Sequence, residues 1–271
     1  LFARNADKSR YPASLTKIMT LYLLFEELES GRMTMRTKLP VSRVAASRSP
    51  SKLYLKPDQT ITVKDAIYAL ITKSANDVAT VVGEALSGTE REFGKRMTRK
   101  ARALGMSATT FRNASGLPHS KQRTTARDMA RLAIAMRRDF PQYFGFFSTK
   151  SFRWRGKRFG NHNKLLSNYT GTDGIKTGYI DASGFNLVAT VERNGVRLIG
   201  VVFGGRTGKT RDAHMVKILD KSFKRVKPGD IRTQLAAASS NAVRALPKTL
   251  PRSLPVPPPA PDTLPVAPPS R

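Results

Sequence analysis

The stretch YPASLTKIMT, residues 11–20, opens a helix and places a serine and a lysine three positions apart. Helical residues at this spacing lie on one face, about 60° apart and roughly 4.5 Å along the axis. Pro12 suits the start of such a helix, and Gly31 suits its end. The apolar residues that follow recur at the steps of an amphipathic helix: Ile18, Leu21, Phe25 and Leu28.

Ser14 and Lys17 are therefore a candidate nucleophile and base. A serine hydroxyl is a weak nucleophile until a base takes its proton. Lysine can do this only when neutral, and neutralising an ordinary lysine at pH 7 costs about 4.6 kcal/mol. The site must lower the pKa of Lys17, either by burial or by a second nearby cation. A serine in the first helical turn also has an unpaired backbone N–H that could stabilise an oxyanion.

Three further motifs bear on this pair. Residues 49–52, SPSK, have the same spacing, but the proline and the non-helical LYLKP that follows exclude a helical pair there. Residues 74–76, SAN, stand at a helix start, where a helix cap and a site residue are both reasonable interpretations. Residues 176–178, KTG, are either an exposed strand or turn, or the source of the second cation.

The composition is that of a basic globular chain. The 271 residues are 39% hydrophobic and include no cysteine, which excludes disulfides, thiol nucleophiles and cysteine-ligated metals. The longest apolar run, LYLLF, is far shorter than the roughly 20 residues of a membrane-spanning helix. The net charge is +29, and residues 1–226 carry +25 of it. This charge indicates either a well-solvated surface or an anionic partner, such as nucleic acid, a membrane surface or a carboxylate-rich polymer.

Residues 1–226 mix helices and strands. Capping boxes predict helix starts at Thr62 and Thr89. Two apolar runs flank an Arg-Asn-Gly turn, residues 193–195, which predicts a β-hairpin, and a closing helix is expected over 210–225. Long helices followed by a hairpin and a last helix predict an α+β fold.

The composition changes near Pro228. Eleven of the 17 prolines lie between that residue and the end of the chain. Such a sequence favours an extended polyproline conformation without a core of its own. We therefore predict a disordered tail or linker over residues 227–271.

Taken in order, the motifs Ser-x-x-Lys, Ser-x-Asn and Lys-Thr-Gly resemble the signature of penicillin-binding proteins and serine β-lactamases. The resemblance is more specific to the serine D-alanyl-D-alanine carboxypeptidases, which are low-molecular-mass penicillin-binding proteins of peptidase family S11. It covers residues 1–226, which we expect to form the catalytic domain. The segments that carry it are RYPASLTKIMT, LITKSANDVA, FRNASGLPHSKQRTTARDMARLA, GIKTGYIDASGFNLVATVERNG and LIGVVFG.

The resemblance implies a role for each motif residue. Ser14 would be the acylated nucleophile, and Lys17 would be its general base. Ser74 would relay a proton to the leaving amine, while Asn76 would hold the substrate backbone and Lys17. Lys176 would supply the second cation and attract the terminal carboxylate of the substrate.

The third motif has further implied roles. Thr177 would hydrogen-bond the substrate carboxylate, and Gly178 would let the substrate lie close to the sheet edge. The backbone N–H groups of Ser14 and Tyr179 would form the oxyanion hole; many relatives have histidine at the tyrosine position. Arg206 is either an additional carboxylate-binding cation or a solvated charge. The resemblance implies no cofactor and no metal.

The fold implied by the resemblance is β-lactamase/transpeptidase-like. It consists of a five-stranded antiparallel sheet flanked by helices, beside an all-helical lobe, with the site between them. LFARN, residues 1–5, would then end the second strand, and the first strand would be missing from this chain. Many relatives also have a small β-rich domain and an amphipathic membrane anchor, in whose place the proline-rich tail stands.

The implied function is removal of the terminal D-alanine from peptidoglycan stem peptides ending in D-Ala-D-Ala. The reaction would pass through an acyl-enzyme that β-lactams also form as covalent inhibitors. The family acts outside the cytoplasmic membrane, so we expect the periplasm or cell envelope, with a signal peptide that is not in this chain. Membrane or wall association would come from missing or tail segments, and nucleic acid is not expected as a partner.

Four other functions are compatible with parts of the sequence. A D,D-endopeptidase of the same fold stays open. A class A β-lactamase needs a glutamate between the second and third motifs, and none occurs between Glu92 and Glu192. A non-enzymatic basic module that binds wall polymer or nucleic acid is disfavoured, because it would not explain the three intact motifs. A metal hydrolase is disfavoured because the histidines are isolated, at His119, His162 and His214.

Overall fold

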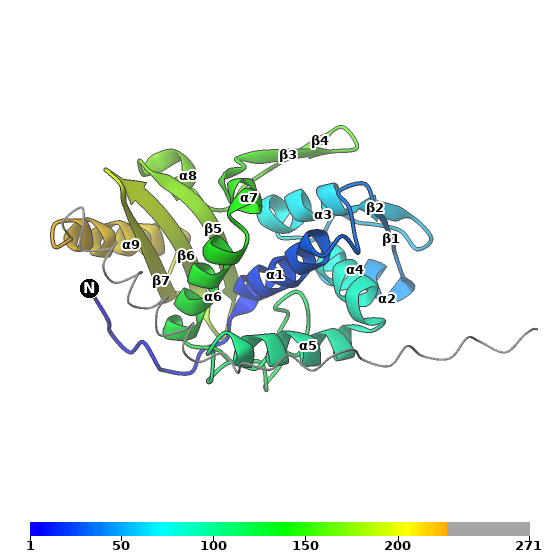
Figure 1. The fold of residues 1–271 in the computed structure, drawn as a ribbon, viewed down its shortest axis with the longest axis horizontal. Coiled ribbons are helices and arrows are strands. Elements are labelled where there is room, and N and C mark those ends of the chain that lie inside the picture. The colour runs from blue at the N-terminus through cyan, green and yellow to red at the C-terminus, as the bar shows by residue number, and fades with distance from the viewer. Residues whose placement is uncertain (227–271) are drawn as a thin grey trace, which may run out of the picture. The chain divides into compact units, whose positions relative to one another are not determined.

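A computed structural model describes residues 1–226; the predicted proline-rich tail, residues 227–271, lies outside the described residues. Within the described part, an antiparallel sheet is covered by helices and adjoins a lobe built mainly of helices (Figure 1). The α+β class predicted from the sequence is confirmed. No helix in residues 1–226 combines the length and the apolar character needed to cross a bilayer.

The first helical segment lies at the centre of this fold. A 3₁₀ turn, η1 (Ala13–Leu15), runs directly into helix α1 (Thr16–Glu29), which lies in the middle of Figure 1. Of the 14 residues of α1, 11 are buried. The helix predicted from the apolar spacing is confirmed, but its polar side is buried as well as its apolar side. Thr20, for example, donates a hydrogen bond to the Ala114 carbonyl at 2.7 Å. Buried polar groups are tolerated when their hydrogen bonds are made in this way.

The lobe packs against α1. Its helices begin at the predicted caps, since the Thr62 and Thr89 hydroxyls accept hydrogen bonds from backbone N–H groups at 3.1 and 3.2 Å. The lobe is not all-helical as predicted, because two three-residue strands pair within it. Strands this short give no alternating pattern that a sequence would reveal. The elements are β1 (Lys38–Pro40), α2 (Arg43–Ala46), β2 (Thr60–Thr62), α3 (Val63–Tyr68), the π-helical turn η2 (Ala69–Lys73), α4 (Asn76–Ser87) and α5 (Glu90–Ala103).

Three antiparallel strands form the sheet. The predicted hairpin is confirmed, because Asn194 and Gly195 join its two strands with φ values of 49° and 74°, the positive values that a type I′ turn requires. Each strand pairs only with its neighbours in the order β5 (Thr172–Ile180), β6 (Gly184–Arg193) and β7 (Val196–Gly205).

Helices cover both faces of the sheet. Helix α9 (Gly208–Phe223) lies on one face, where a side chain on Gly200 would collide with Met215, so the glycine allows close packing. The alternate residues of the same strand, Ile199 and Val201, pack against the main hydrophobic core. Helix α6 (Ala126–Asp139) contacts β6 and β7 as well.

The described sheet has three strands instead of the expected five, and residues 1–5 form no strand. Leu1 and Phe2 are 70% and 51% exposed. The segment runs beside β7, but a hollow of about 300 Å³ lies between them. A strand is defined by backbone hydrogen bonds to a neighbour, and none joins residues 1–5 to β7.

A two-stranded ribbon between α6 and β5 was not predicted either. Its strands have four residues each and are rich in arginine and lysine, so they are too short and too polar to be recognised as strands. The remaining elements are α7 (Pro141–Phe144), the 3₁₀ turn η3 (Gly145–Ser148), the ribbon strands β3 (Ser151–Trp154) and β4 (Lys157–Gly160), and α8 (Leu165–Asn168).

A buried carboxylate fixes the loop that precedes β2. Asp77, in the first turn of α4, is fully buried. Its carboxylate accepts hydrogen bonds from the backbone N–H groups of Leu53 and Leu55, both at 3.1 Å, and of Val78 at 2.9 Å. We expect Asp77→Ala to lower the free energy of unfolding by about 2–4 kcal/mol, because it leaves two loop amides buried without acceptors.

Urea denaturation measures this loss. Asp77→Asn keeps one acceptor oxygen and should destabilise the protein less than the alanine variant. An alanine variant as stable as the parent protein would show that the loop amides do not depend on this carboxylate.

Candidate active site

Two glycines fix the position of Ser14. A side chain on Gly178 of β5 would place its Cβ 3.0 Å from the Ser14 nitrogen. On the other side, a Cβ on Gly116, whose φ is +89°, would lie 1.8 Å from the Ala13 carbonyl oxygen. No other residue type fits at position 116, and a side chain at position 178 would push the Ser14 turn away by a few tenths of an ångström. The turn that carries Ser14 is therefore held between the sheet and the loop 113–117.

Lys17 lies beneath Ser14 and is fully buried. Its Nζ donates hydrogen bonds to Asn76 Oδ1 at 2.7 Å and to the Ser115 carbonyl at 2.6 Å, and lies 3.3 Å from Ser14 Oγ. Burial, and then the positive charge of Lys176, hold the pKa of Lys17 well below its usual value. Both causes that the sequence left open are thus present, and burial is the larger.

Lys176 comes from β5 and is also buried. Its Nζ donates to the Thr177 carbonyl at 3.1 Å. Burial, and then the charge of Arg211, lower the pKa of Lys176 to about 7. The sequence reasoning singled out Arg206 as a further cation, but that side chain is exposed and does not line the pocket, whereas Arg211 does. No spacing rule distinguishes the two arginines.

The second motif is not a helix cap. Ser74 joins η2 to α4 in the left-handed conformation, with φ 60° and ψ 37°, and α4 has no side-chain cap. The Ser74 Oγ is buried and has no hydrogen-bond partner within residues 1–226. Asn76 is held at its backbone, where its N–H donates to the Ser51 carbonyl at 2.6 Å. Its side-chain Nδ2 donates to the Ser49 carbonyl at 3.0 Å.

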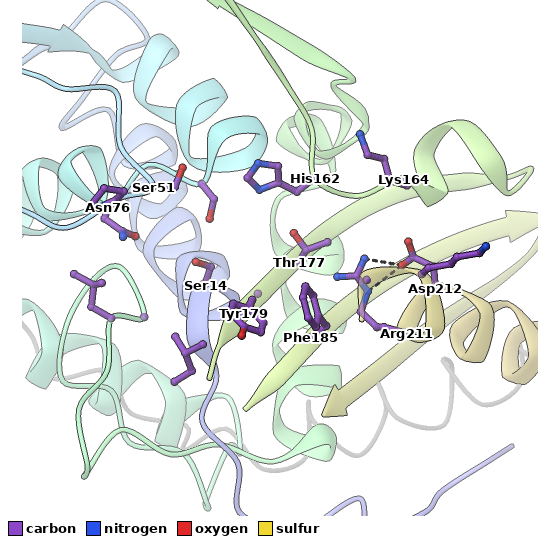
Figure 2. Close-up of a pocket in the computed structure, with 18 of the residues that line it drawn as sticks. Ser14, Ser51, Asn76, His162, Lys164, Thr177, Tyr179, Phe185, Arg211 and Asp212 are labelled. Carbon is purple, nitrogen blue, oxygen red and sulfur yellow. Dashed lines mark hydrogen bonds and ion pairs between the residues drawn. The ribbon is translucent and has the colours of Figure 1, made fainter. Parts of the chain in front are cut away.

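The segment SPSK, residues 49–52, therefore has a structural part in the site. It is not helical, so its exclusion as a second serine–lysine pair agrees with the structure. It nevertheless forms one wall of the pocket, with Ser51 facing the cavity (Figure 2). The sequence carried no signal for this, because carbonyl oxygens are common to every residue type.

The pocket has a volume of about 730 Å³ and brings the predicted residues of all three motifs together. His162, Lys164 and Phe185 also line it (Figure 2). Burial, and then the charge of Lys176, lower the pKa of His162 to about 4, so this ring is neutral at pH 7. The predicted residues on its wall are Ser14, Ser74, Asn76, Thr177, Gly178 and Tyr179, with Lys17 and Lys176 behind them.

Tyr179 lies on the pocket wall with its ring against Phe185. It is 50% exposed, its ring centroid lies 4.3 Å from that of Phe185, and its hydroxyl donates to Asp181 at 2.6 Å. The backbone of β5 at this point lies against the turn η1. The neighbouring Gly178 is the residue at which the backbone of β5 comes close to the serine.

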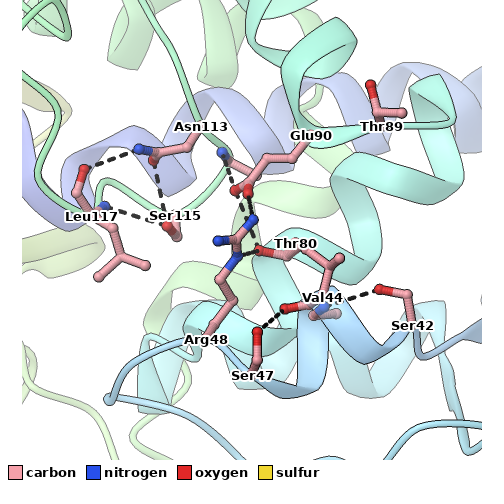
Figure 3. Close-up of polar contacts among 12 residues, drawn as sticks. Ser42, Val44, Ser47, Arg48, Thr80, Thr89, Glu90, Asn113, Ser115 and Leu117 are labelled. Carbon is pink, nitrogen blue, oxygen red and sulfur yellow. Dashed lines mark hydrogen bonds and ion pairs between the residues drawn. The ribbon is translucent and has the colours of Figure 1, made fainter.

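A carboxylate outside the pocket holds the loop 113–117 in place (Figure 3). Glu90, at the start of α5, accepts hydrogen bonds from the Ala114 N–H at 3.0 Å and from the Thr80 hydroxyl at 3.2 Å, and forms an ion pair with Arg48. The next residue in the loop, Ser115, supplies the carbonyl bound by Lys17. The sequence reasoning used Glu90 only as part of a capping box, and missed this contact.

This arrangement is suited to acyl transfer. A serine hydroxyl lies beside a lysine whose pKa is depressed, and a second cation lies close by. The hydroxyl oxygen of another serine, Ser74, has no hydrogen-bond partner in the described part of the chain. Within residues 1–226, no three histidine, aspartate or glutamate side chains come together as metal ligands would.

Comparison with known proteins agrees with this geometry. A family model described as D-alanyl-D-alanine carboxypeptidase, peptidase S11, matches residues 1–207. D-alanyl-D-alanine carboxypeptidase DacF of Bacillus subtilis is 36% identical over 227 residues, which are 82% of this chain and 58% of DacF. DacA of Escherichia coli is 36% identical over 231 residues, 83% of this chain and 57% of DacA. The chain thus spans less than three fifths of these relatives.

Solved structures show the same fold. Penicillin-binding protein 5 of Haemophilus influenzae is 32% identical with a TM-score of 0.80, over 83% of this chain and 67% of that one. Penicillin-binding protein D2 of Listeria monocytogenes, solved in an ampicillin-bound form, is 32% identical with a TM-score of 0.75, over 82% and 91%. The chain therefore belongs to the D-alanyl-D-alanine carboxypeptidases of peptidase family S11.

Proposed function

We propose that residues 1–226 are the catalytic domain of a serine D-alanyl-D-alanine carboxypeptidase that removes the terminal D-alanine from peptidoglycan stem peptides. The observation that carries the proposal is the buried Lys17, with Nζ 3.3 Å from Ser14 Oγ and a pKa lowered by burial and by Lys176. An uncharged amine at this place can take the hydroxyl proton at neutral pH.

The reaction follows from the positions of these groups. Neutral Lys17 takes the proton of Ser14 while Oγ bonds to the carbonyl carbon of the penultimate D-alanine. The backbone N–H groups of Ser14 and Tyr179 stabilise the negative oxygen that forms. The carbon–nitrogen bond then breaks, and Ser74 gives its proton to the departing amine of D-alanine while taking one from protonated Lys17, which becomes neutral again. Water hydrolyses the serine ester and returns Ser14 to its starting state.

Recognition of the substrate uses the cationic end of the pocket. The terminal carboxylate lies against Lys176, the Thr177 hydroxyl and Arg211, while Asn76 holds the peptide backbone. A carboxylate here stabilises the protonated form of Lys176. β-Lactams carry a carboxylate and a strained amide, so they acylate the same serine; a relative of this fold has been solved with ampicillin bound.

The place of action follows from the substrate. Peptidoglycan lies outside the cytoplasmic membrane, so we place the enzyme in the periplasm or cell envelope. Cleavage of crosslinks as a D,D-endopeptidase would use the same groups, and no contact in the pocket favours it over carboxypeptidase activity.

Penicillin labelling tests the nucleophile. We expect intact mass spectrometry to show one stable adduct on Ser14, and the protein to release D-alanine from a soluble pentapeptide. Ser14→Ala should abolish both, because no other activated hydroxyl is present in the pocket. Ser49→Ala, which changes the serine of the second Ser-x-x-Lys, is the matched control and should label normally. An adduct on any other residue would disprove the assignment.

The pH dependence of acylation tests the two lysines. Acylation should fall on the acid side as Lys17 gains a proton, and on the alkaline side as Lys176, with a pKa of about 7, loses one. Arg211→Gln should move the alkaline limb of kcat/KM to higher pH, because removing that positive charge favours protonated Lys176. Arg206→Gln, at an exposed position, is the control and should leave the alkaline limb of kcat/KM where it is. If the limb also stays in place in Arg211→Gln, its assignment to Lys176 is contradicted.

Substitution of Glu90 tests the support of the loop 113–117. Glu90→Ala should slow acylation by about 10- to 100-fold, because a displacement of about 1 Å of catalytic groups has effects of this size. The charge of Glu90 raises the pKa of Lys17, so Glu90→Gln should also move the acid limb to lower pH. Glu92→Ala, on the exposed side of the same helix, should change neither. A folded Glu90→Ala protein with parental acylation rates would rule out this support.

A further inference from the structure

The ribbon formed by β3 and β4 concentrates positive charge without any negative charge. We define residues 150–160 as the basic hairpin. Residues 140–172 contain no aspartate or glutamate, and they contain six cationic residues. Five of these lie in the basic hairpin, and the sixth, Lys164, lines the pocket. The five are Lys150, Arg153, Arg155, Lys157 and Arg158.

The charges of the basic hairpin are exposed and repel one another. Arg153 and Arg158 are directly opposite across the two strands, an arrangement of like charges that destabilises a sheet. Both side chains are exposed, as are Arg155 and Lys157 at the tip. Within residues 1–226, none of them forms an ion pair with a carboxylate. An anionic ligand would relieve this repulsion.

The basic hairpin is nevertheless firmly attached to the protein. Phe152 is 8% exposed and stacks on Tyr68 of α3, with ring centroids 5.6 Å apart and planes 14° apart. Figure 1 shows the ribbon extending from the sheet over the helical lobe. The charges are thus presented on a fixed support rather than on a mobile loop.

The aromatic rings of the basic hairpin are already covered by cations. The Arg155 guanidinium lies 5.4 Å from the Trp154 ring, and the Lys73 and Lys157 amines lie 5.5 and 5.8 Å from the Phe159 ring. Single-stranded nucleic acid is bound by stacking bases on open aromatic faces. This surface offers cations instead of open rings, which favours a ligand recognised by its negative charges alone.

The end of the basic hairpin leads into the active-site pocket. Strand β4 ends at Gly160, and His162 and Lys164, which follow it, line the cavity beside Thr177 (Figure 2). A long ligand lying on the basic hairpin is therefore continuous with whatever occupies the pocket. The polymer that carries the scissile peptide is the ligand that satisfies this geometry.

We propose that the basic hairpin is a docking surface for polymeric peptidoglycan, whose neighbouring stem peptides present repeated carboxylates while one stem peptide enters the pocket. The proposal rests on the proposed carboxypeptidase function, and adds a preference for polymer over soluble peptide. Cationic surfaces of this kind raise the local concentration of an anionic ligand, and salt weakens them.

The test compares two triple variants of the full chain. One removes hairpin charges (Arg153→Gln, Arg155→Gln, Arg158→Gln), and the control removes three exposed charges from α5 (Arg91→Gln, Lys95→Gln, Arg99→Gln). At low salt, the hairpin variant should release D-alanine from polymeric peptidoglycan about tenfold more slowly. Its kcat/KM on a soluble pentapeptide should stay within about twofold of the parent, and the polymer defect should shrink as salt is added.

Binding is measured separately from turnover, by cosedimentation of Ser14→Ala protein with insoluble peptidoglycan. If the hairpin variant no longer sediments with peptidoglycan and the α5 variant still does, docking is supported. If the parent enzyme releases no D-alanine, the proposed carboxypeptidase function is refuted, but this binding result still stands. Docking would be overturned if both variants lost binding equally, or if the hairpin variant lost as much activity on soluble pentapeptide as on polymer. It would also be overturned if the hairpin variant acted on polymer as fast as the parent. Loss of binding to single-stranded DNA alone would identify a nucleic-acid surface. Thermal unfolding should show that the hairpin variant is at least as stable as the parent, because the substitutions remove the repulsion between Arg153 and Arg158.

Discussion

The site depends on keeping one lysine uncharged inside the protein. An ammonium group loses the stabilisation of water when it is buried, so the folded environment determines whether Lys17 is a cation or a base. The structure supplies partial compensation through the oxygens of Asn76 and Ser115, and opposes the charge through burial and Lys176. The polar side of α1 therefore points inward.

This requirement explains the architecture around it. Four separate parts of the chain must meet at one point: the turn that carries Ser14, the start of α4, the loop 113–117 and strand β5. Two of these parts make contacts outside the pocket: Asp77 joins the start of α4 to the loop at Leu53, and Glu90 holds the loop at Ala114. The glycines at 116 and 178 then allow backbone to approach backbone where a side chain would prevent it.

Much of the site could be predicted from the sequence because its chemical groups are side chains, whose identities the sequence gives directly. The need to lower the pKa of Lys17 pointed to a second cation, and the charge of Lys176 lowers it together with burial, which is the larger cause. The segments that support the site could not be predicted in this way. Ser49, Ser51 and Ser115 contribute backbone carbonyls. Every residue type has a backbone carbonyl, so the sequence does not indicate which ones form these contacts.

The differences between the predicted fold and the structure have similar causes. The sequence of α1 alternates as a surface helix does, and only the tertiary contacts of Thr20 and Lys17 show that its polar side is internal. The strands β1, β2, β3 and β4 have three or four residues each, too few for a periodic pattern. Arg206 and Arg211 look alike in sequence, and the position of α9 against the sheet decides which one is buried.

The hydrogen bonds of Lys17 also join residues that are 59 and 98 positions apart in the chain. Contacts of such separation form late, because long loops must close before they are made. Until then the lysine is solvated, its pKa is ordinary, and the neighbouring serine is an unreactive alcohol. Reactivity of this serine is therefore a property of the completed fold, and a chain that is still folding cannot acylate itself on a passing peptide or antibiotic.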